Sequence, residues 1–206
     1  MRKEKKRTPE LQEAMAKIFL RSMSILRAEK KLGVLLLQLS PAFSPAKHEL
    51  RELTPLLDMF SGYRLAIELR NRNWAIGEQL SSTIDFLRKR ETIFVNVDAP
   101  TVEHFTILPP ELNEITNRRV AYLRLHGRDA RAYLTGKTVA ARFNYDYSDR
   151  EVEEIGQRTR KLAREAQEVH VVFNNNALDY APHAALRLRK ALGQIVATAP
   201  ETLELF

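Results

Sequence analysis

Five short apolar runs alternate along the chain with amphipathic segments of helical period, and this alternation is the feature that most constrains the fold. The runs have the length of buried strands, and the segments between them repeat apolar residues every three or four positions. The strands are expected at residues 34–39, 65–69, 92–97, 120–125 and 169–173, and the helices at residues 9–31, 44–62, 76–90, 148–166 and 182–196. Strands that alternate with helices form right-handed βαβ units, so we expect an α/β fold with a parallel sheet.

Local signals predict where several helices begin and end. Thr8, followed by a proline, has the chemistry of an N-cap, and Gly33 is expected to end that first helix. Pro55 predicts a kink or a restart within the second helix. Ser148 and Glu151 have the spacing of a capping box, which predicts a helix start at that point.

The remaining segments are interpreted as loops or as a fully covered strand. Residues 99–119 carry three prolines, so we expect a long loop there with one helical turn at 111–115. A second long loop is expected at residues 126–147. The run at 34–39 is apolar except for Gln38 and predicts a strand that is buried on both faces.

Side chains alternate across a strand, so each run divides into two faces. One face is wholly apolar. Its residues are Leu35, Leu37, Leu39, Leu65, Ile67, Leu69, Ile93, Val95, Val97, Ala121, Leu123, Leu125, Val169, Val171 and Phe173. The other face turns polar toward the C-terminal strand ends, with Gln38, Glu68, Arg70, Asn96, Asp98, Arg124, His126, His170 and Asn174. A barrel-type sheet accommodates such a pattern better than a doubly wound sandwich, because polar groups under a helix layer are costly to bury.

The polar strand ends supply the candidate catalytic residues. Glu68, Asp98 and His126 combine two carboxylates with an imidazole, which is chemistry suited to acid/base catalysis. The same oxygen and nitrogen atoms could hold a divalent metal, although no ligand motif of recognised spacing is present and no metal is predicted. A third interpretation is an ionic network in which the glutamate pairs with neighbouring arginines and has only a structural role.

Further residues at or near the same strand ends have side chains that could bind a small ligand. Guanidinium groups match carboxylate and phosphate geometry, so three arginines predict a small anionic compound, unless they only balance the two carboxylates. Asparagine amides could orient the ligand or bond to loop backbone, and aromatic rings could stack on it or pack in the core. The predicted ligand-binding residues are Gln38, Arg70, Trp74, Arg124, Arg128, Tyr145, Tyr147, Asn174 and Asn175.

Composition excludes several alternatives. The 206 residues contain no cysteine, which rules out disulfides and thiolate chemistry within the chain and favours a cytoplasmic location. The longest apolar run is far too short to span a bilayer, so no membrane is expected as a partner. Five basic residues and one glutamate within residues 1–7 account for four of the seven net positive charges. We therefore expect a basic tail at 1–7, one domain at 8–198 and a C-terminal tail at 199–206.

Several motifs resemble the YecE-like family, the domain of unknown function 72. They are Lys31-Leu32-Gly33, Leu37-Gln38-Leu39-Ser40-Pro41, Glu68-Leu69-Arg70 with Trp74, Arg124-Leu125-His126-Gly127-Arg128, Tyr145 with Tyr147, and Phe173-Asn174-Asn175 with Ala181 and Ala184. The resemblance covers residues 31–192 and implies a TIM-barrel-like fold. Two positions depart from it, since Asn71 stands where the family has histidine and Ser40 where it has proline.

The resemblance also implies that the barrel is incomplete, with about five β/α units that begin at the family's third helix. No segment matches the three strands that ordinarily come first in the family. A truncated or misassigned start, completion by another chain and local rearrangement are the three explanations. An open sheet edge would favour self-association.

Two function classes follow from these residues. The first is an enzyme that acts on a small anionic or phosphorylated compound, with His126 as acid/base, Glu68 or Asp98 as its partner and the arginines as anchors. The second is a non-catalytic protein that binds a ligand or nucleic acid through arginines and aromatic rings. No dinucleotide, P-loop or serine-hydrolase motif is present, and no cofactor can be assigned.

Overall fold

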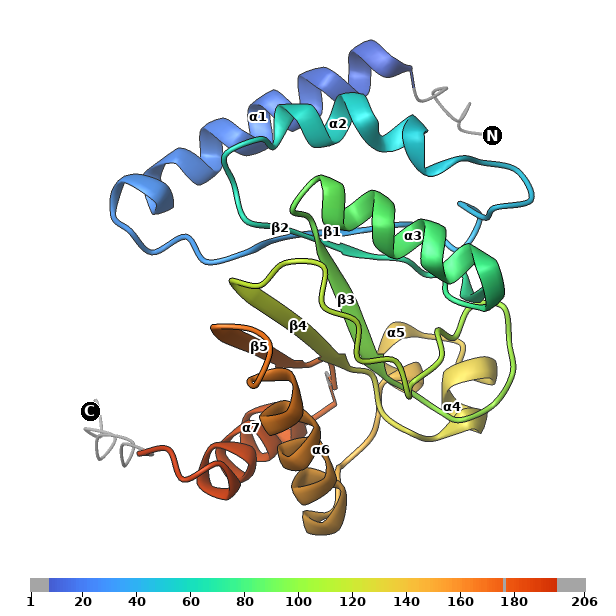
Figure 1. Ribbon diagram of the computed structural model, residues 1–206. Helices are drawn as coiled ribbons and strands as arrows, with labels where there is room; N and C mark the ends of the chain where they lie inside the picture. Colours follow the sequence, from blue (N-terminus) through green and yellow to red (C-terminus); the bar gives the residue numbers. More distant parts are fainter. Residues whose placement is uncertain (1–7, 176, 196–206) are drawn as a thin grey trace, which may run out of the picture.

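The computed structural model describes residues 8–175 and 177–195 and contains five parallel strands in one sheet (Figure 1). The strands are β1 (Leu35–Gln38), β2 (Leu65–Glu68), β3 (Ile93–Asp98), β4 (Val120–Leu125) and β5 (Glu168–Phe173). The helices are α1 (Pro9–Ala28), α2 (Thr54–Met59), α3 (Gly77–Lys89), α4 (Ala130–Thr135), α5 (Val139–Arg142), α6 (Asp149–Leu162) and α7 (Tyr180–Ala191), with 3-10 turns η1 (Leu50–Leu53) and η2 (Arg72–Trp74). The prediction of an α/β fold is confirmed.

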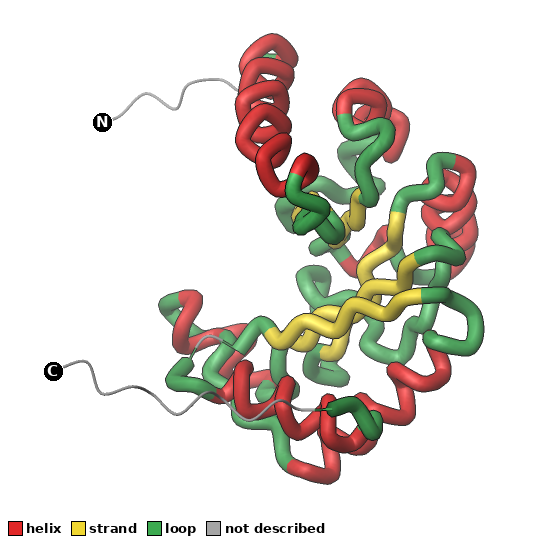
Figure 2. Tube along the Cα trace, turned by 90° about the vertical axis from the view of Figure 1, so that its left-hand side faces the viewer, coloured by secondary structure: helices red, strands yellow, loops and turns green. Residues whose placement is uncertain are grey.

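The sheet curls into a half-barrel. Its strands lie in the order β1-β2-β3-β4-β5, without the reversal that defines a doubly wound sheet. Figure 2 shows the strands as an open arc with the main helices on its outer side. The curl leaves a concave inner face, to which each strand contributes alternate side chains.

Local capping explains where the helices begin. The Thr8 hydroxyl accepts a hydrogen bond from the Leu11 amide at 3.3 Å, and Ser148 and Glu151 form the reciprocal capping box that their spacing predicts. Pro55 lies in the first turn of α2, directly after η1, so the second helix restarts as expected. The first helix ends earlier than predicted, because Lys30 rather than Gly33 adopts the left-handed conformation, at φ 55°.

Strand register overturns the predicted division of faces at β3. Ala66 pairs with Ile93, and Val97 pairs with Arg124 in the next strand. Paired residues of parallel strands point to the same side, so β3 contributes its odd-numbered side chains to the inner face. Asp98, paired with Leu125, therefore points outward. The expectation that all five polar strand ends share one face is wrong at this strand.

The segment between β3 and β4 explains why polar residues of β3 can point outward. Residues 99–119 form a loop without the helical turn expected at 111–115, and this loop packs along the strand. Asn96 donates to the Glu114 carbonyl at 2.9 Å and accepts from the Glu114 amide at 2.8 Å. Arg158 of α6 reaches the Val97 carbonyl at 2.9 Å. Loop backbone and a guanidinium thus satisfy the hydrogen-bonding groups on the outer side of β3.

Two further expectations differ from the structure. β1 lies at the edge of the sheet and is not buried on both faces, because Leu36 is 37% exposed and Gln38 is exposed. Residues 126–147 are not a structureless loop, since they contain α4 and α5. The tails predicted at 1–7 and 199–206 lie outside the described residues. The last helix ends at Ala191, earlier than the predicted end at 196. Within the described part of the chain, no helix is long and apolar enough to cross a membrane.

Candidate functional site

A buried carboxylate on the inner face organises the main polar cluster. Glu68 ends β2 with no exposed surface, and both of its oxygens accept hydrogen bonds. Oε1 is 2.9 Å from an Arg70 guanidinium nitrogen and 3.1 Å from Nε2 of His126, while Oε2 binds Arg124. We call this group, with two amide side chains described next, the Glu68 cluster. Its members are Gln38, Glu68, Arg70, Arg124, His126 and Asn174.

Arg124 links both edges of the sheet across the concave face. Its Nη1 donates to Oε1 of Gln38 on β1 at 2.7 Å, and its Nη2 donates to Oδ1 of Asn174 beyond β5 at 2.6 Å. The Nε atom of this arginine is buried without a hydrogen-bond partner among the described residues. The side chain retains 10% exposure, so the cluster meets solvent at this guanidinium.

Hydrogen bonds on both ring nitrogens orient His126. The Glu68 carboxylate accepts from Nε2, so Nε2 carries the proton of the neutral ring. Nδ1 then accepts from the Asn174 amide at 3.2 Å, and this assignment agrees with the Asn174 oxygen facing Arg124. The imidazole is 2% exposed. It is therefore held by its neighbours and not open at a free nitrogen.

Burial and neighbouring charges together keep Glu68 ionised and His126 neutral. Burial disfavours the Glu68 carboxylate, but the His126 hydrogen bond and the charges of Arg70 and Arg124 outweigh it and lower the pKa of Glu68 to about 2. Burial lowers the pKa of His126 below its ordinary value, and the bond to Glu68 only partly opposes this shift. At neutral pH the cluster therefore contains one carboxylate, two guanidinium groups and a neutral imidazole.

Asp98 organises a second, separate group on the outer side of the sheet. Arg128 donates to both Asp98 oxygens, from Nε at 3.0 Å and from Nη2 at 2.8 Å, and the Tyr147 hydroxyl donates to Oδ1 at 2.9 Å. The same hydroxyl accepts from the Gly127 amide at 2.8 Å. The structure thus brings Glu68 and His126 together but places Asp98 elsewhere, against the expectation that the three share one site.

Two glutamates of α6 complete this second group, which we call the Asp98 cluster. Arg128 also donates to Glu154 at 2.7 Å, and the Tyr145 hydroxyl donates to Glu151 at 2.5 Å. The Arg128 guanidinium is therefore surrounded by carboxylates. The members of the Asp98 cluster are Asp98, Arg128, Tyr145, Tyr147, Glu151 and Glu154.

Trp74 and Asn175 lie in neither cluster. The Trp74 ring is 2% exposed, stacks on Phe43 at 5.2 Å and donates from Nε1 to the Phe43 carbonyl. It is a core residue with no open face for a ligand. Asn175 is 3% exposed beside Gly127, and its side-chain amide has no partner among the described residues.

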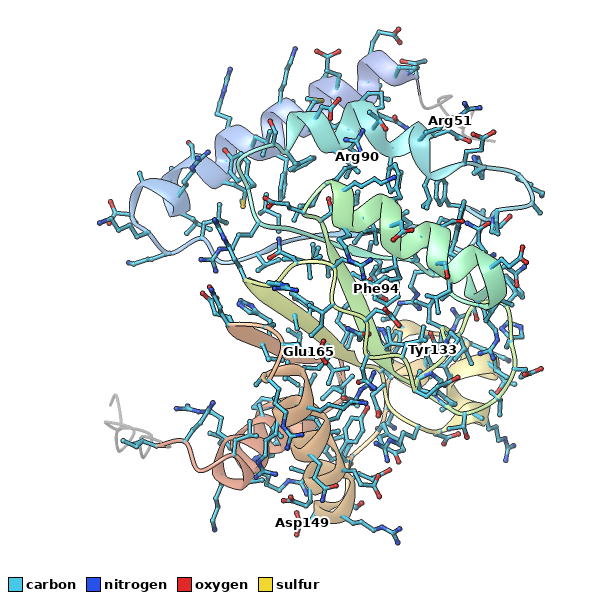
Figure 3. The ribbon with its side chains drawn as sticks, in the orientation of Figure 1. Arg51, Arg90, Phe94, Tyr133, Asp149 and Glu165 are labelled. Carbon is cyan, nitrogen blue, oxygen red and sulfur yellow. The ribbon has the colours of Figure 1, made fainter. Side chains whose placement is uncertain are left out.

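Tyr133 of α4 is a site residue that the sequence reasoning missed. Its hydroxyl accepts from Arg70 at 3.1 Å, and its ring packs edge-on against Phe143, which also approaches the His126 ring. Figure 3 places Tyr133 near the ends of β3 and β4. Asp129, which caps α4 by accepting from the Ala132 amide, was the available signal for this helix.

Little space remains behind the Glu68 cluster. A cavity of about 10 Å³ lies between Glu68, Arg70, His126 and Tyr133, which is close to the minimum for one water molecule. The side of the cluster toward Tyr133 therefore has no room for more than one water molecule. Within residues 8–175 and 177–195, no group of three or more His, Asp or Glu side chains is arranged to hold a metal ion.

Comparisons with known proteins agree on one family. A family profile described as "Protein of unknown function DUF72" matches residues 2–204. The UPF0759 protein YunF of Bacillus subtilis is 25% identical over 181 residues, which cover 85% of this chain and 64% of that protein. The chain thus spans somewhat under two-thirds of this curated relative.

Solved structures of the same family share the fold. A DUF72 family protein (EF0366) from Enterococcus faecalis superimposes with a TM-score of 0.83 at 30% identity, over 93% of this chain and 70% of that one. A DUF72 family protein (TM1631) from Thermotoga maritima gives a TM-score of 0.75 at 28% identity, over 87% of this chain and 65% of that one.

Proposed function

The chain belongs to the DUF72 family, and from this premise we propose that it binds a small anionic compound, carboxylate or phosphate, at the Glu68 cluster. The observation that carries the proposal is an imbalance of charge. Two arginines share one carboxylate in a cluster whose charged side chains are at most 15% exposed, which leaves one positive charge largely removed from water. Such a charge is unfavourable alone, and an anion offsets it.

The donors around Arg124 support a bound anion at the concave face. The guanidinium has a buried Nε without a partner among the described residues, and unsatisfied buried donors are expected to meet a water or a ligand. Exposed Gln38 and half-buried Asn174 flank the same guanidinium and could turn toward a ligand. Two amides and a guanidinium suit the planar geometry of a carboxylate or the oxygens of a phosphate.

Two variants that change the net charge of the Glu68 cluster in opposite directions test this proposal. Arg70→Met removes the excess positive charge while Glu68 keeps Arg124 and His126, and it should weaken binding of inorganic phosphate by about 10-fold or more. Glu68→Gln raises the excess charge and should tighten binding in the molecules that fold. Isothermal titration calorimetry measures both, with Arg119→Met, an exposed arginine away from the cluster, as the matched control. Equal affinities for all four proteins would contradict the proposal.

A second candidate function adds proton transfer at the same site. His126 is neutral, and Glu68 and Asn174 fix its orientation, as an acid/base imidazole requires. Its Nδ1 becomes available only if Asn174 turns toward the ligand. Turnover of sugar phosphates, followed by phosphorus NMR, should disappear in His126→Gln while phosphate binding remains. Absence of turnover by the unmodified protein across hydroxy acids and sugar phosphates would remove this candidate.

The small-molecule hypothesis is better supported than nucleic-acid binding. Base stacking needs open aromatic faces, whereas Trp74 and Tyr147 are almost fully buried and the Tyr145 hydroxyl is hydrogen-bonded to α6.

We also propose that the half-barrel has a TIM-barrel-like architecture. The sequential strand order and the polar inner strand ends support that assignment.

A further inference from the structure

A cleft rich in arginine lies at the N-terminal ends of the strands, opposite the end that carries the Glu68 cluster. Its volume is about 860 Å³, and its walls come from the end of α3, the segment before β4 and the end of α6. Five of its ten lining residues are arginines, namely Arg64, Arg88, Arg118, Arg119 and Arg164. We call these five arginines the basic cleft.

The chain concentrates its positive charge around this cleft. Segments 88–91, 117–119 and 160–165, which contribute to its walls, hold eight basic and two acidic residues. Together with residues 1–7, these segments carry more positive charge than the net +7 of the whole chain, so the remaining residues are net negative. The excess charge is therefore a property of this end of the molecule and not of its surface in general.

Three of the arginines are open to a ligand. Arg118, Arg119 and Arg164 are exposed and form no ion pair with another described residue. The other two arginines form ion pairs at 2.8 and 3.1 Å, but both pairs are about half exposed, where an ion pair is weak and an anion can compete. Two glutamates, Glu91 and Glu165, also line the cleft, so guanidinium groups outnumber carboxylates there.

Helix dipoles account for only some of these arginines. Basic residues in the last turns of α3 and α6 complement the helix C-termini. Arg118 and Arg119 instead precede a strand, where no helix ends. Asn117 holds their segment against α3, because its amide donates to the Glu91 carbonyl at 2.6 Å and its oxygen accepts from the Arg119 amide at 2.9 Å. The backbone that carries these two arginines is thus fixed before any ligand binds.

We propose that the basic cleft binds the phosphate backbone of a nucleic-acid duplex, without regard to base sequence. Guanidinium groups match phosphate oxygens, and a duplex presents closely spaced phosphates that several arginines contact at once. Backbone contacts require no stacking on bases, so the burial of the aromatic rings near the Glu68 cluster does not oppose this site. The two sites lie at opposite ends of the strands and are independent.

The lining residues favour a duplex over other anions. Among the described residues that line the cleft none is aromatic, and the one apolar residue, Ile115, is half-buried. A single strand is held by stacking on aromatic rings and a membrane by apolar side chains that enter the lipid, so neither finds those contacts here. A free phosphate ion meets only one or two exposed cations at a time, and it should bind the Glu68 cluster instead.

Fluorescence anisotropy with labelled duplexes of about 20 base pairs tests the proposal, and affinity should fall steeply from about 50 to about 200 mM salt. Two unrelated sequences should bind equally well. Arg118→Glu combined with Arg164→Glu should weaken binding at least about 10-fold and lower the slope of log affinity against log salt by about two. Arg21→Glu combined with Arg131→Glu, at exposed positions on α1 and α4, changes the net charge equally and is the matched control. Residues 1–7 are present in both double variants, so their charge does not separate them.

Several results would overturn the proposal. They are binding that is absent or insensitive to salt, equal losses in the two double variants, and tighter binding of a single strand, of phosphatidylserine vesicles or of tripolyphosphate than of the duplex. Circular dichroism verifies that both double variants fold. Both should keep the phosphate affinity of the unmodified chain at the Glu68 cluster, so failure of the duplex site and failure of the proposed function are measured separately.

Discussion

The two polar clusters lie on opposite faces of one sheet and differ in the sign of the charge that remains after their charged groups are paired. In the Asp98 cluster a single arginine meets three carboxylates, and its tyrosine hydroxyls are bonded as well. In the Glu68 cluster two arginines meet one carboxylate, and the Arg124 Nε has no partner among the described residues. The first cluster leaves excess negative charge, partly on the half-exposed Glu154, and links the end of β4 to α6. The second leaves one positive charge, and it is there that we propose an anion binds.

This difference shows that residue type alone does not identify an anion site. Arg124 and Arg128 stand four positions apart at the end of the same strand, and both were predicted to bind the ligand. The turn at Gly127 sends them to opposite faces, where Arg128 is surrounded by acidic groups. Available charge, and not the number of arginines, distinguishes the two clusters.

The largest expected effect is on stability at the buried carboxylate. Glu68→Ala leaves two guanidinium groups without their shared partner and should lower the free energy of unfolding by about 3–5 kcal/mol. Asp98→Ala should cost less, about 1–3 kcal/mol, because Arg128 keeps its glutamate. Urea unfolding at neutral pH measures both. A larger loss for Asp98→Ala would reverse the ranking of the clusters.

Low pH should destabilise the protein through the Glu68 cluster, and high pH through the Asp98 cluster. The pKa of Glu68 falls from 4.5 to about 2 on folding, so its contribution of roughly 3 kcal/mol is present above pH 4.5 and is lost as the pH falls toward 2. The lowered pKa of His126 makes the loss of stability begin at a higher pH, because the imidazole of the unfolded chain takes up a proton below pH 6.5 while the folded one does not. Burial and the nearby Asp98 charge raise the pKa of Tyr147. The stability that this shift contributes is present below pH 10 and is lost as the pH rises above 10.

Variants separate these two limbs of the pH–stability curve. Glu68→Gln should flatten the acid limb between pH 4.5 and 2, whereas Tyr147→Phe should flatten part of the alkaline limb. Urea midpoints across the pH range give both slopes. If Tyr147→Phe altered the acid limb as strongly as Glu68→Gln, the two clusters would not be independent.

An intermediate effect is expected at the turn between the clusters. Gly127 has φ 86°, and a Cβ there would lie 2.6 Å from Cβ of Tyr145. Gly127→Ala should therefore cost about 1–3 kcal/mol from backbone strain, with a further cost from the close contact. Gly193→Ala, also at positive φ but with no atom of the described residues within 4 Å of the added Cβ, is the matched control for strain alone. Equal losses in thermal unfolding would mean that the turn is not closely packed.

The smallest effect is expected from one hydroxyl. Tyr147→Phe leaves the Gly127 amide without its acceptor and Asp98 with one donor fewer, which should cost about 1–2 kcal/mol at neutral pH. Phosphate affinity should stay unchanged, because the variant lies on the outer side of the sheet. A change in phosphate affinity would connect the Asp98 cluster to the binding site.

The order of strands and helices was predictable, but the face of β3 was not. Alternation separates Val97 from Asp98 without saying which of them points inward. That choice depends on the register between β2 and β3, which pairs Ala66 with Ile93 through a crossover that no local pattern describes. The prediction was that polar strand ends share one face. The polar side chains of β3 instead point to the opposite face, along which loop 99–119 lies.

The site was predictable to the extent that it lies on regular strand ends. Glu68, Arg124 and His126 come together because β2 and β4 present them to one face, as expected. Tyr133 was missed because α4 has only six residues, and such short helices depend on tertiary contacts for their stability. The N-cap at Asp129 was visible, but nothing local showed that the ring beside it would reach Arg70.

Nitrogen NMR of the arginine side chains during a phosphate titration tests the central claim most directly. The Nε–H resonances of Arg124 and Arg128 can be assigned with Arg124→Lys and Arg128→Lys variants. The charge imbalance predicts that the Arg124 resonance shifts and saturates while that of Arg128, bound to Asp98, remains in place. A saturating shift at Arg128 with none at Arg124 would contradict the assignment of the anion site to the Glu68 cluster.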